Sequence, residues 1–398
     1  MMRPSDSLTG NQYIAPDGCR VGVMYHTVNI EGYRGFDHFE MRNLGCVNLL
    51  VGKNNSGKTS VLEALHLLSY GGDLTALWQL SNRRGERFSD DRDSPRYTGD
   101  IELDISHLFK GHELQLGCKF TITARNQTPE SAVTFEIGEP SSKERIEAPT
   151  PPPVESGALP LSRMVLRVHA SPPAPSRVVA ISRRGGINFE NLELPRRTPN
   201  NARRVREFVP SSHFISSESL SGNELAQLWD TIQLKPAEQL VLEALRFIDP
   251  EIQQIRSMGA SRYFGDRSGF IVKRADYREP FPLGSLGDGA WRMLAMAIVV
   301  TQCRDGVLLI DEIDTGLHYT VMADMWKLIF NAAREFNVQV FATTHSFDCV
   351  HSLATLCSLV GHEEDGITIQ RIEANRNAAV AFTGPQIRMI AERDIEVR

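Results

Sequence analysis

The chain has 398 residues, of which 41% are hydrophobic and 23% are charged, and its formal net charge is −6. This length and apolar content suffice for a sizeable core and exclude a disordered chain. The acidic balance argues against a surface that binds nucleic acid throughout, but it allows a local basic groove. No apolar run reaches the roughly eighteen residues of a transmembrane helix, so no membrane segment is expected.

The N-terminus and the cysteines bear on the cellular location. Residues 1-20 lack the apolar stretch of a signal peptide, and we expect them to form a flexible N-terminal tail. The six cysteines contain no CxxC pair and no metal-ligand spacing. This usage argues against a disulfide framework and against a zinc site. The sequence therefore predicts a cytoplasmic protein.

The first part of the folded region reads as strands that lead into a glycine-rich loop. Residues 21–51 alternate apolar and polar side chains and end in Val47–Val51, which we expect to be a buried run. The sequence GKNNSGKTS follows at once, and apolar residues at helical spacing then occupy Ser60–Tyr70. Further strands are expected at Ile101–Leu108, Leu116–Thr123 and Ala132–Ile137.

The composition of the chain changes twice in its middle part. Nine of the 21 prolines lie between residues 139 and 175, which predicts an exposed loop within a lobe over residues 139-176. Helical signals return between Gly222 and Met258 and predict a small helical lobe. No heptad pattern persists over several turns, so long coiled-coil arms are not expected.

The last part alternates between helix and strand, which predicts a parallel sheet with crossover helices. We expect helices after Gly289, around Val321–Phe336 and after Ser346. The expected strands are Gly306–Ile310, Val338–Thr344 and, at the edge of the sheet, Ile367–Ile372 and Ala378–Phe382.

The segment Gly52–Thr59 satisfies the pattern GxxxxGK[ST] between a strand and a helix, so a chance glycine turn is the weaker interpretation. The glycines allow backbone N–H groups to surround phosphates, and the following helix points its positive end at them. Lys58 would neutralise the β- and γ-phosphates, and the Thr59 hydroxyl would bind Mg²⁺. The predicted ATP-binding residues here are Gly52, Asn54, Asn55, Ser56, Gly57, Lys58, Thr59 and Ser60.

Two later strands end in polar residues that fit the same chemistry. The apolar run Val307–Ile310 ends in Asp311 and Glu312. Asp311 would hold Mg²⁺, and Glu312 would orient or deprotonate the attacking water. His345, after the next strand, would donate a hydrogen bond to the γ-phosphate. The alternatives are solvated strand-end acids and a structural histidine. The predicted catalytic residues are therefore Glu312, Lys58 and His345, with Thr59 and Asp311 at the metal.

The order of these motifs resembles the ABC-type ATPases of the SMC, RecF and OLD (overcoming-lysogenization-defect) families, and most closely the single-domain OLD-like ATPases without a nuclease domain. The segments that carry the resemblance are Gly32–Phe36, Asn48–Lys58, Ser-Leu-Gly-Asp-Gly at 285–289, 308–318 and Thr-Thr-His-Ser at 343–346. The resemblance implies an α/β P-loop NTPase fold of the ABC-ATPase type. Its mostly parallel mixed sheet would be flanked by helices and joined by an antiparallel β subdomain and a small helical lobe.

The resemblance also implies a division of residues 21-398 and a second half of the site. The parts are an N-terminal β/P-loop part at 21-138, the Pro-rich loop at 139-176, a basic segment and helical lobe at 177-284, and a part with the signature and the later motifs at 285-398. In this family the signature segment of one subunit covers the γ-phosphate held by the other. That role falls on Ser285, Gly287, Asp288 and Gly289.

The signature segment departs from the family pattern. Gly287 stands where the family has a serine, unless Ser285 replaces that hydroxyl, so the strength of the ATP clamp is in question and we expect slow hydrolysis. Asp314 and Leu317-His318 match the loop that touches the opposite subunit in this family. The equal alternative is that the turn Asp314-Thr315-Gly316 caps a helix. The glutamine that links the metal to the helical lobe has no clear match, and Gln79 is a weak candidate. Tyr33 and Arg34 would meet the nucleotide or lie on a surface strand.

Eight arginines lie in the segment 177–206 and form a candidate strip that would bind DNA, RNA or an acidic partner. The alternative is that they form a solvated charged face. They are Arg177, Arg183, Arg184, Arg196, Arg197, Arg203, Arg204 and Arg206. About fifty residues follow His345, too few for the nuclease domain of the longer OLD proteins, and Glu363–Asp365 read as a solvated loop. We therefore expect a separate effector protein.

The leading function is an ATP-hydrolysing switch that forms a homodimer or higher oligomer and controls this effector, a nuclease or toxin, in phage defence or DNA maintenance. The alternatives are a RecF-like DNA-binding clamp in DNA repair and a nucleotide-gated scaffold with negligible turnover. The expected cofactors are ATP and Mg²⁺.

Overall fold

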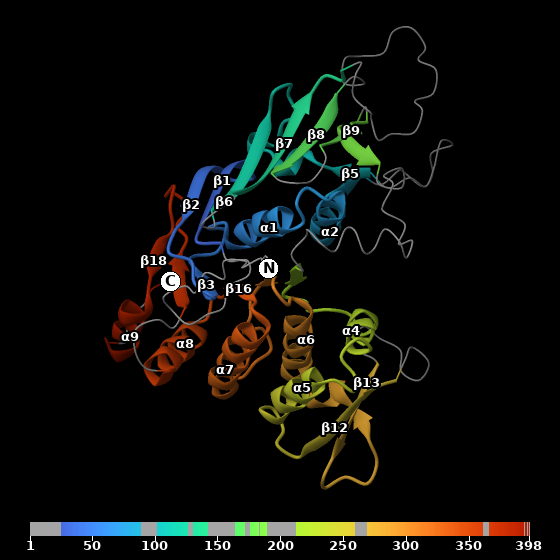
Figure 1. The fold of residues 1–398 in the computed structure, drawn as a ribbon, viewed down its shortest axis with the longest axis vertical. Helices are drawn as coiled ribbons and strands as arrows, with labels where there is room; N and C mark the ends of the chain where they lie inside the picture. Colours follow the sequence, from blue (N-terminus) through green and yellow to red (C-terminus); the bar gives the residue numbers. More distant parts are fainter. Residues whose placement is uncertain are drawn as a thin grey trace, which may run out of the picture.

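The computed structural model describes residues 25–88, 102–125, 130–141, 164–171, 176–182, 184–188, 212–258, 269–360, 366–393, 395 and 397. The molecule has three parts stacked along its long axis (Figure 1). An antiparallel β lobe lies at one end, the main sheet with its helices lies in the middle, and a small lobe of helices and strands lies at the other end. No helix among these residues is long and apolar enough to cross a membrane.

The main sheet has the strand order β11-β15-β16-β3-β17-β18, and only the last pair is antiparallel. All residues of β3, β15 and β16 are buried, as expected for parallel strands covered on both faces. The strands are β11 (Ser212–Ile215), β15 (Val307–Ile310), β16 (Gln339–Thr343), β3 (Val47–Val51), β17 (Ile367–Arg371) and β18 (Val380–Phe382).

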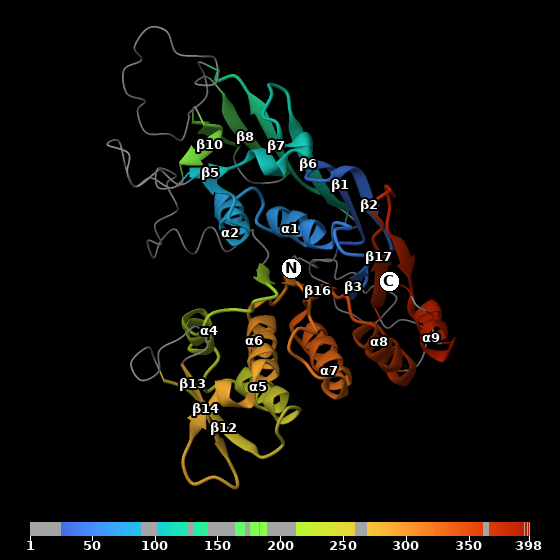
Figure 2. The same cartoon turned by 180° about the vertical axis from the view of Figure 1, so that it is seen from behind.

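Helices cover the two faces of this sheet differently. On one face lie α6 (Asp288–Gln302), α7 (Tyr319–Phe336), α8 (Phe347–Val360) and α9 (Gly384–Arg393), and α5 (Pro236–Arg246) packs against α6 in the small lobe. On the other face, α1 (Lys58–Ser69) lies between the main sheet and the antiparallel sheet and contacts both, and α2 (Leu74–Arg84) follows it (Figure 2). Because α1 is covered from two sides, ten of its residues are buried.

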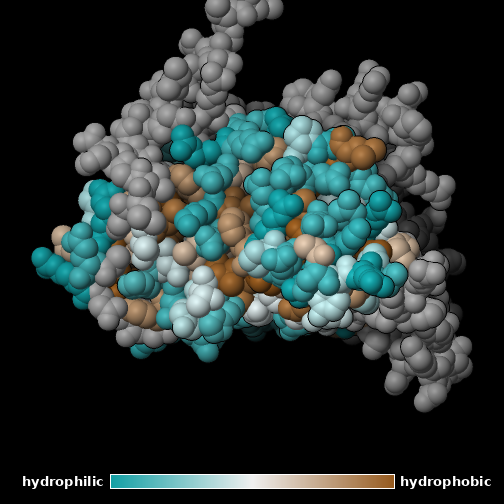
Figure 3. All heavy atoms as spheres, turned by 90° about the horizontal axis from the view of Figure 1, so that it is seen from below, coloured by the Kyte–Doolittle hydropathy of each residue, from teal (hydrophilic) through white to brown (hydrophobic). Residues whose placement is uncertain are grey.

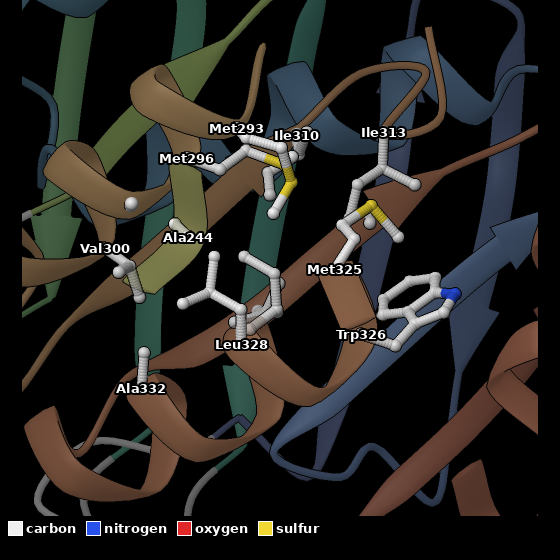
Figure 4. Close-up of a cluster of buried hydrophobic side chains, with 14 of the residues drawn as sticks. Ala244, Met293, Met296, Val300, Ile310, Ile313, Met325, Trp326, Leu328 and Ala332 are labelled. Atoms are coloured by element: carbon white, nitrogen blue, oxygen red, sulfur yellow. The ribbon is translucent and has the colours of Figure 1, made fainter. Parts of the chain in front are cut away.

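The main sheet separates two hydrophobic cores. Alternate residues of its strands point to opposite faces, so Leu49 and Ile310 join one core while Leu50 and Leu309 join the other. Figure 4 shows the first core, in which Met293, Met325 and Trp326 pack beneath the sheet. Seen from the end that carries α5, the surface is mostly hydrophilic, with hydrophobic side chains gathered in its central part (Figure 3).

The antiparallel lobe has the strand order β2-β1-β6-β7-β8-β9, with the small sheet β10-β5-β4 beside it. Its strands are β1 (Thr27–Tyr33), β2 (Phe36–Met41), β4 (Arg87–Phe88), β5 (Glu102–Asp104), β6 (Lys119–Arg125), β7 (Ser131–Gly138), β8 (Val165–Ser171), β9 (Arg177–Ala180) and β10 (Gly186–Asn188). Short 3-10 turns at Ser106–Leu108 and Lys110–His112 complete it. The expected strand at Ile101–Leu108 therefore covers only three residues, Glu102–Asp104.

The prediction of an irregular loop over residues 139-176 is wrong for Val165–Ser171, which forms β8 between β7 and β9. Its apolar residues alternate, but the prolines on either side dominate the composition of the segment. The remaining Pro-rich stretches and the N-terminal tail at 1-20 lie outside the described residues, as do Glu363–Asp365. Two parts of the predicted basic segment also form strands, β9 and β10, which belong to the two sheets of the antiparallel lobe.

The small lobe is only partly helical. It contains α4 (Gly222–Trp229) and α5, but also the antiparallel sheet of β12 (Ile252–Ser257), β13 (Phe270–Arg274) and β14 (Phe281–Pro282). The prediction of helix up to Met258 is therefore wrong for the residues after Pro250. Ile252 and Ile255 have helical spacing. In the strand, a register shift between Ile252 and Gln254 lets both isoleucine side chains turn inward.

Candidate nucleotide site

The loop after β3 has the shape that phosphate binding requires. Gly52 has φ 145°, and a Cβ there would lie 2.3 Å from the carbonyl oxygen of Ile372. Gly57 has φ 99°, and a Cβ there would lie 2.4 Å from the Phe36 ring. Only glycine fits both positions. The helix α1 begins at Lys58 with no side-chain cap, so its first N–H groups remain available to an anion.

Lys58 lies inside this loop. Its ammonium group donates hydrogen bonds to the carbonyl oxygens of Gly52, at 2.8 Å, and Lys53, at 2.9 Å. Burial lowers the pKa of Lys58, and the charges of Asp311 and Glu312 oppose that shift. The lysine is thus folded back on the loop, where incoming phosphate oxygens would replace the two carbonyls as its partners.

Strand order brings the distant motifs together. Strand β16 lies between β3 and β15, in parallel with both, so the residues after these three strands meet at one edge of the sheet. The Thr59 hydroxyl lies 3.1 and 3.2 Å from the two carboxylate oxygens of Asp311. Lysine, threonine and aspartate, predicted from separate motifs, therefore converge.

One residue that sequence reasoning gave no role holds both acids in place. The buried Thr343 hydroxyl donates to Asp311 Oδ1 at 2.7 Å and accepts from the backbone N–H of Glu312 at 2.8 Å. Glu312 has φ 48°, a left-handed conformation that a residue other than glycine seldom adopts. The hydrogen bond from its N–H to Thr343 fixes this turn, and the glutamate side chain is directed toward solvent, 44% exposed.

His345 lies beside Glu312. Its Nε2 is 3.8 Å from Glu312 Oε1, and both side chains are partly exposed. A phosphate and an attacking water could therefore reach the pair from solvent. The structure brings together all three predicted catalytic residues and both predicted metal ligands at the end of the main sheet.

A second unassigned residue, Arg292 on α6, supports the same turn from below. It is 2% exposed and donates to three backbone carbonyls: Ser216 at 2.5 Å, Asp311 at 2.6 Å and Glu312 at 2.9 Å. Burial lowers the pKa of Arg292 to about 10, although Asp311, Asp314 and Glu312 oppose this shift. The sequence signal was a single arginine inside the apolar run of α6.

The residues fit a magnesium ion that arrives with a triphosphate. Among the described residues no group of three or more His, Cys, Asp or Glu side chains could hold a metal by itself. The Thr59 hydroxyl and the Asp311 carboxylate offer hard oxygen ligands on adjacent elements, and Mg²⁺ commonly completes its shell with phosphate oxygens and water. These two residues would hold the ion.

The comparisons with known proteins cover both halves of the site. A model described as "AAA ATPase domain" matches residues 24–151, and a model described as "AAA domain, putative AbiEii toxin, Type IV TA system" matches residues 196–348. The first match includes Lys58, and the second includes Asp311 and His345. Both models describe AAA-type ATPase domains, so the chain is a P-loop ATPase similar to that family.

Individual relatives of this ATPase are distant. An "ATP/GTP phosphatase" of Helicobacter pylori is 24% identical over 83% of this chain and 87% of its own length. The "DNA replication and repair protein RecF" of Rickettsia conorii is 38% identical, but over only 13% of this chain and 14% of its own. An SMC head bound to the C-winged helix domain of ScpA is 12% identical, covers 90% of this chain and 98% of its own, and has a TM-score of 0.46.

The predicted signature segment of the ATPase lies at the start of α6. Gly287 has φ 89° and precedes the helix, and Ser285, Gly287 and Asp288 are exposed. A Cβ on Gly289 would lie 2.8 Å from the carbonyl oxygen of Gly316. The segment therefore packs tightly against the loop that follows Glu312, while its outer side remains open.

That loop does not cap a helix. Asp314 accepts a hydrogen bond from the Thr344 hydroxyl at 2.6 Å, and α7 begins five residues later, after His318, with no side-chain cap. The helix-capping alternative is wrong. His318 is exposed, and its Nδ1 lies 2.9 Å from the Thr320 hydroxyl. The loop thus presents His318 on the surface of the ATPase.

The structure places three other residues for which the sequence suggested a role. Tyr33 and Arg34 are buried, so the surface-strand alternative is wrong, and Arg34 forms an ion pair with the fully buried Glu63 at 2.9 Å. That pairing makes Arg34 part of the packing around α1. Gln79 lies on α2 and bonds to His66 at 2.9 Å, which gives it a partner in α1. Ser216–Ser221, the segment that follows β11 next to β15, contains no glutamine. It therefore offers no other candidate for the glutamine that links the metal to the helical lobe.

Only part of the arginine strip can be placed. Arg177 belongs to β9, and Arg184 lies in the turn before β10. The other six arginines, at 183, 196, 197, 203, 204 and 206, lie outside the described residues. Nucleic-acid binding through this strip stays a prediction.

Proposed function

We propose that this ATPase hydrolyses ATP in a nucleotide-dependent dimer and controls a separate effector, in the manner of the OLD-like ATPases. The observation that carries the proposal is the convergence of Lys58, Thr59 and Asp311 on one edge of the main sheet. A triphosphate placed there would be held by the N–H groups of the glycine loop and by Lys58, and the bound Mg²⁺ would withdraw charge from its oxygens.

The acids beyond the sheet supply the chemistry of water attack. Glu312 would accept the proton of the attacking water while Thr343 and Arg292 hold its backbone still. His345 would donate to the γ-phosphate oxygen and remain next to Glu312. The products would be ADP and phosphate.

The exposed start of α6 supports the dimer. Ser285, Gly287 and Asp288 face solvent at a helix N-terminus, which favours the phosphate of a second subunit. Since Gly287 lacks a hydroxyl at the position where the family has one, we expect turnover to be slow. The close packing of Gly289 on Gly316 would link closure of the dimer to the loop beside Glu312.

Control of an effector is supported by two features. The second matching model carries the words "putative AbiEii toxin, Type IV TA system", which agrees with a role beside a toxic activity in phage defence or DNA maintenance. The described residues hold no acidic cluster that could serve a nuclease metal. We propose that cutting or toxicity resides in a partner protein.

Steady-state ATP hydrolysis and ATP binding by the full chain test the proposal. Lys58→Ala should abolish ATP binding, and Glu312→Gln should retain binding, lower turnover by about 10²–10⁴-fold and accumulate dimer in size-exclusion chromatography. The matched controls are Lys327→Ala, which removes an exposed lysine paired with Asp324, and Glu335→Gln, at an exposed position on α7. Unchanged turnover in Glu312→Gln would refute the assigned role.

The same assay separates the two alternatives. A RecF-like clamp would bind DNA with an affinity that falls steeply with salt, and DNA would change its ATPase rate. A scaffold would bind ATP and dimerise without measurable turnover. The RecF relatives match only a short part of this chain, so the switch remains the favoured function.

A further inference from the structure

A polar cavity of about 470 Å³ lies outside the nucleotide site. It is bounded by α1, α2, the strand β11 and the N-terminal part of the small lobe. Because β11 is the edge strand of the main sheet, the cavity opens beside that sheet, between α2 and α4. Its volume falls in the range of small-molecule sites.

Two residues that line this cavity each carry a buried polar atom with no hydrogen-bond partner within the described part of the chain. These atoms are Nδ1 of His66 and the hydroxyl of Ser219. His66 is 2% exposed, and an unsatisfied polar atom at such a site costs about 1–3 kcal/mol. A ligand that supplies the missing partners would recover this free energy.

The chemistry of the missing partner follows from the tautomer of His66. Its Nε2 lies 2.9 Å from the Gln79 carbonyl oxygen, which only accepts, so Nε2 carries the hydrogen. Burial lowers the pKa of His66 to about 4, and the ring is neutral at pH 7. Nδ1 is therefore a buried acceptor and requires an N–H or O–H donor.

The rest of the lining favours a planar group. Three aromatic residues, Tyr70, Trp78 and Phe214, line the cavity together with two residues that carry side-chain amides, Asn82 and Gln227. Arg83 stacks over the Phe214 ring at 3.6 Å. Aromatic faces bind flat heterocycles, and amides pair with their polar edges.

We propose that this cavity binds a neutral, planar heterocycle with N–H donors, of the class of the nucleobases, and that its occupancy changes the ATPase rate. The binding site stands independently of ATP turnover, whereas the regulatory effect rests on the proposed function. The donor edge of the base would meet His66 Nδ1, and its ring would lie among the aromatic side chains.

A direct set of contacts connects the cavity to the nucleotide site. Ser216 and Leu220 line the cavity. The carbonyl oxygen of Ser216 accepts from Arg292 at 2.5 Å, and that of Leu220 accepts from Trp291 at 3.1 Å. Both donors lie in the first turns of α6, next to the signature segment. A ligand that shifts residues 216–220 therefore acts on the arginine that holds the Glu312 turn.

Binding is tested by isothermal titration calorimetry of adenosine and guanosine into the full chain, saturated with a nonhydrolysable ATP analogue so that the nucleotide site is filled. We expect saturable binding of at least one nucleoside, one per chain. His66→Phe removes the acceptor and should weaken binding about tenfold, the value of one hydrogen bond of about 1.4 kcal/mol. His351→Phe, at an exposed position on α8, should bind as the wild type does.

A second variant protects the test against misfolding of the buried substitution. Asn82 is exposed at the rim of the cavity, so Asn82→Trp should fold and fill the opening, and it should abolish nucleoside binding. The site would be overturned by the lack of saturable binding for both nucleosides, or by equal binding in the wild type and Asn82→Trp.

Regulation is measured separately, as the ATPase rate with and without saturating nucleoside. We expect a change of about threefold or more, the size of a weak coupling between sites, and no change in Asn82→Trp. A bound nucleoside with an unaltered rate would overturn the regulatory effect alone. A chain that hydrolyses no ATP refutes the proposed function but leaves the binding result intact.

Discussion

Thr343→Val offers the sharpest test of how the two acids are held. Valine keeps the shape of threonine but removes the hydroxyl that bonds to the Asp311 carboxylate and to the Glu312 N–H. The bond to the carboxylate is charge-assisted and contributes about 1.5–3 kcal/mol, and the orphaned buried N–H costs about 1–3 kcal/mol. Since partial relaxation recovers some of this, we expect a loss of about 2–4 kcal/mol in the free energy of unfolding.

The functional loss should exceed the stability loss. Released from Thr343, the Glu312 turn and the Asp311 carboxylate can move by a fraction of an ångström, and displacement of a catalytic group by about 1 Å lowers a rate about 10²-fold. We expect kcat to fall about 10–100-fold, with ATP binding largely kept because Lys58 and the glycine loop are untouched.

The assays are urea unfolding followed by tryptophan fluorescence, and steady-state ATP hydrolysis. Thr343→Ser, which retains the hydroxyl, should recover most of both properties. Thr355→Val serves as the control, because the exposed Thr355 hydroxyl donates only to a carbonyl of its own helix. If Thr343→Val matched Thr355→Val in stability and in rate, the reasoning would be refuted.

Three further outcomes are expected. Arg292→Met removes a hydrogen-bond donor from three carbonyls. Those of Ser216 and Glu312 keep the N–H groups of Ser219 and Thr315, but that of Asp311 loses its donor at a cost of about 1–3 kcal/mol, so urea should unfold the variant before wild type. Arg292→Lys should restore little, and the exposed-surface control Arg256→Met should change nothing. Because burial depresses the pKa of His66 to about 4, below the unfolded value of about 6.5, its contribution to stability is complete above pH 6.5 and is lost as the pH falls toward 4. The thermal midpoint of His66→Gln should therefore fall less over this range than those of the wild type and His351→Gln, and parallel curves would contradict the assignment. Burial raises the thiol pKa of Cys303 and Cys349, so iodoacetamide at pH 8 should modify both far more slowly than the partly exposed Cys118, as peptide mass spectrometry would show.

The parts of the fold that were predicted correctly are those encoded by local pattern. The fully buried strands ending at Val51, Ile310 and Thr343 were recognisable because parallel strands buried on both faces read as mostly apolar runs. The P-loop was recognisable because its glycines satisfy requirements of the backbone at Gly52 and Gly57. The alternation of helix and strand then implied that these ends share one edge of a sheet.

The missed features depend on partners far away in the sequence. Arg292 and Thr343 act on residues that only the sheet order brings near, 19 to 76 positions apart for the bonds of Arg292 and about 31 for Thr343. Strand β8 was hidden by the prolines around it, and β12 by two isoleucines at helical spacing. Such features become visible only when a neighbouring strand or carbonyl is known.

The contact between Gly289 and Gly316 has a practical use. Because a side chain at Gly289 would meet the carbonyl oxygen of Gly316, the start of α6 and the loop after Glu312 are in close contact, and we expect them to move together. A fluorescent or spin label on exposed Ser285 and another on exposed Thr315 would then report one and the same displacement. Labels placed on both would also keep a fixed separation throughout the cycle, which supplies an internal ruler for measuring how far a second subunit approaches.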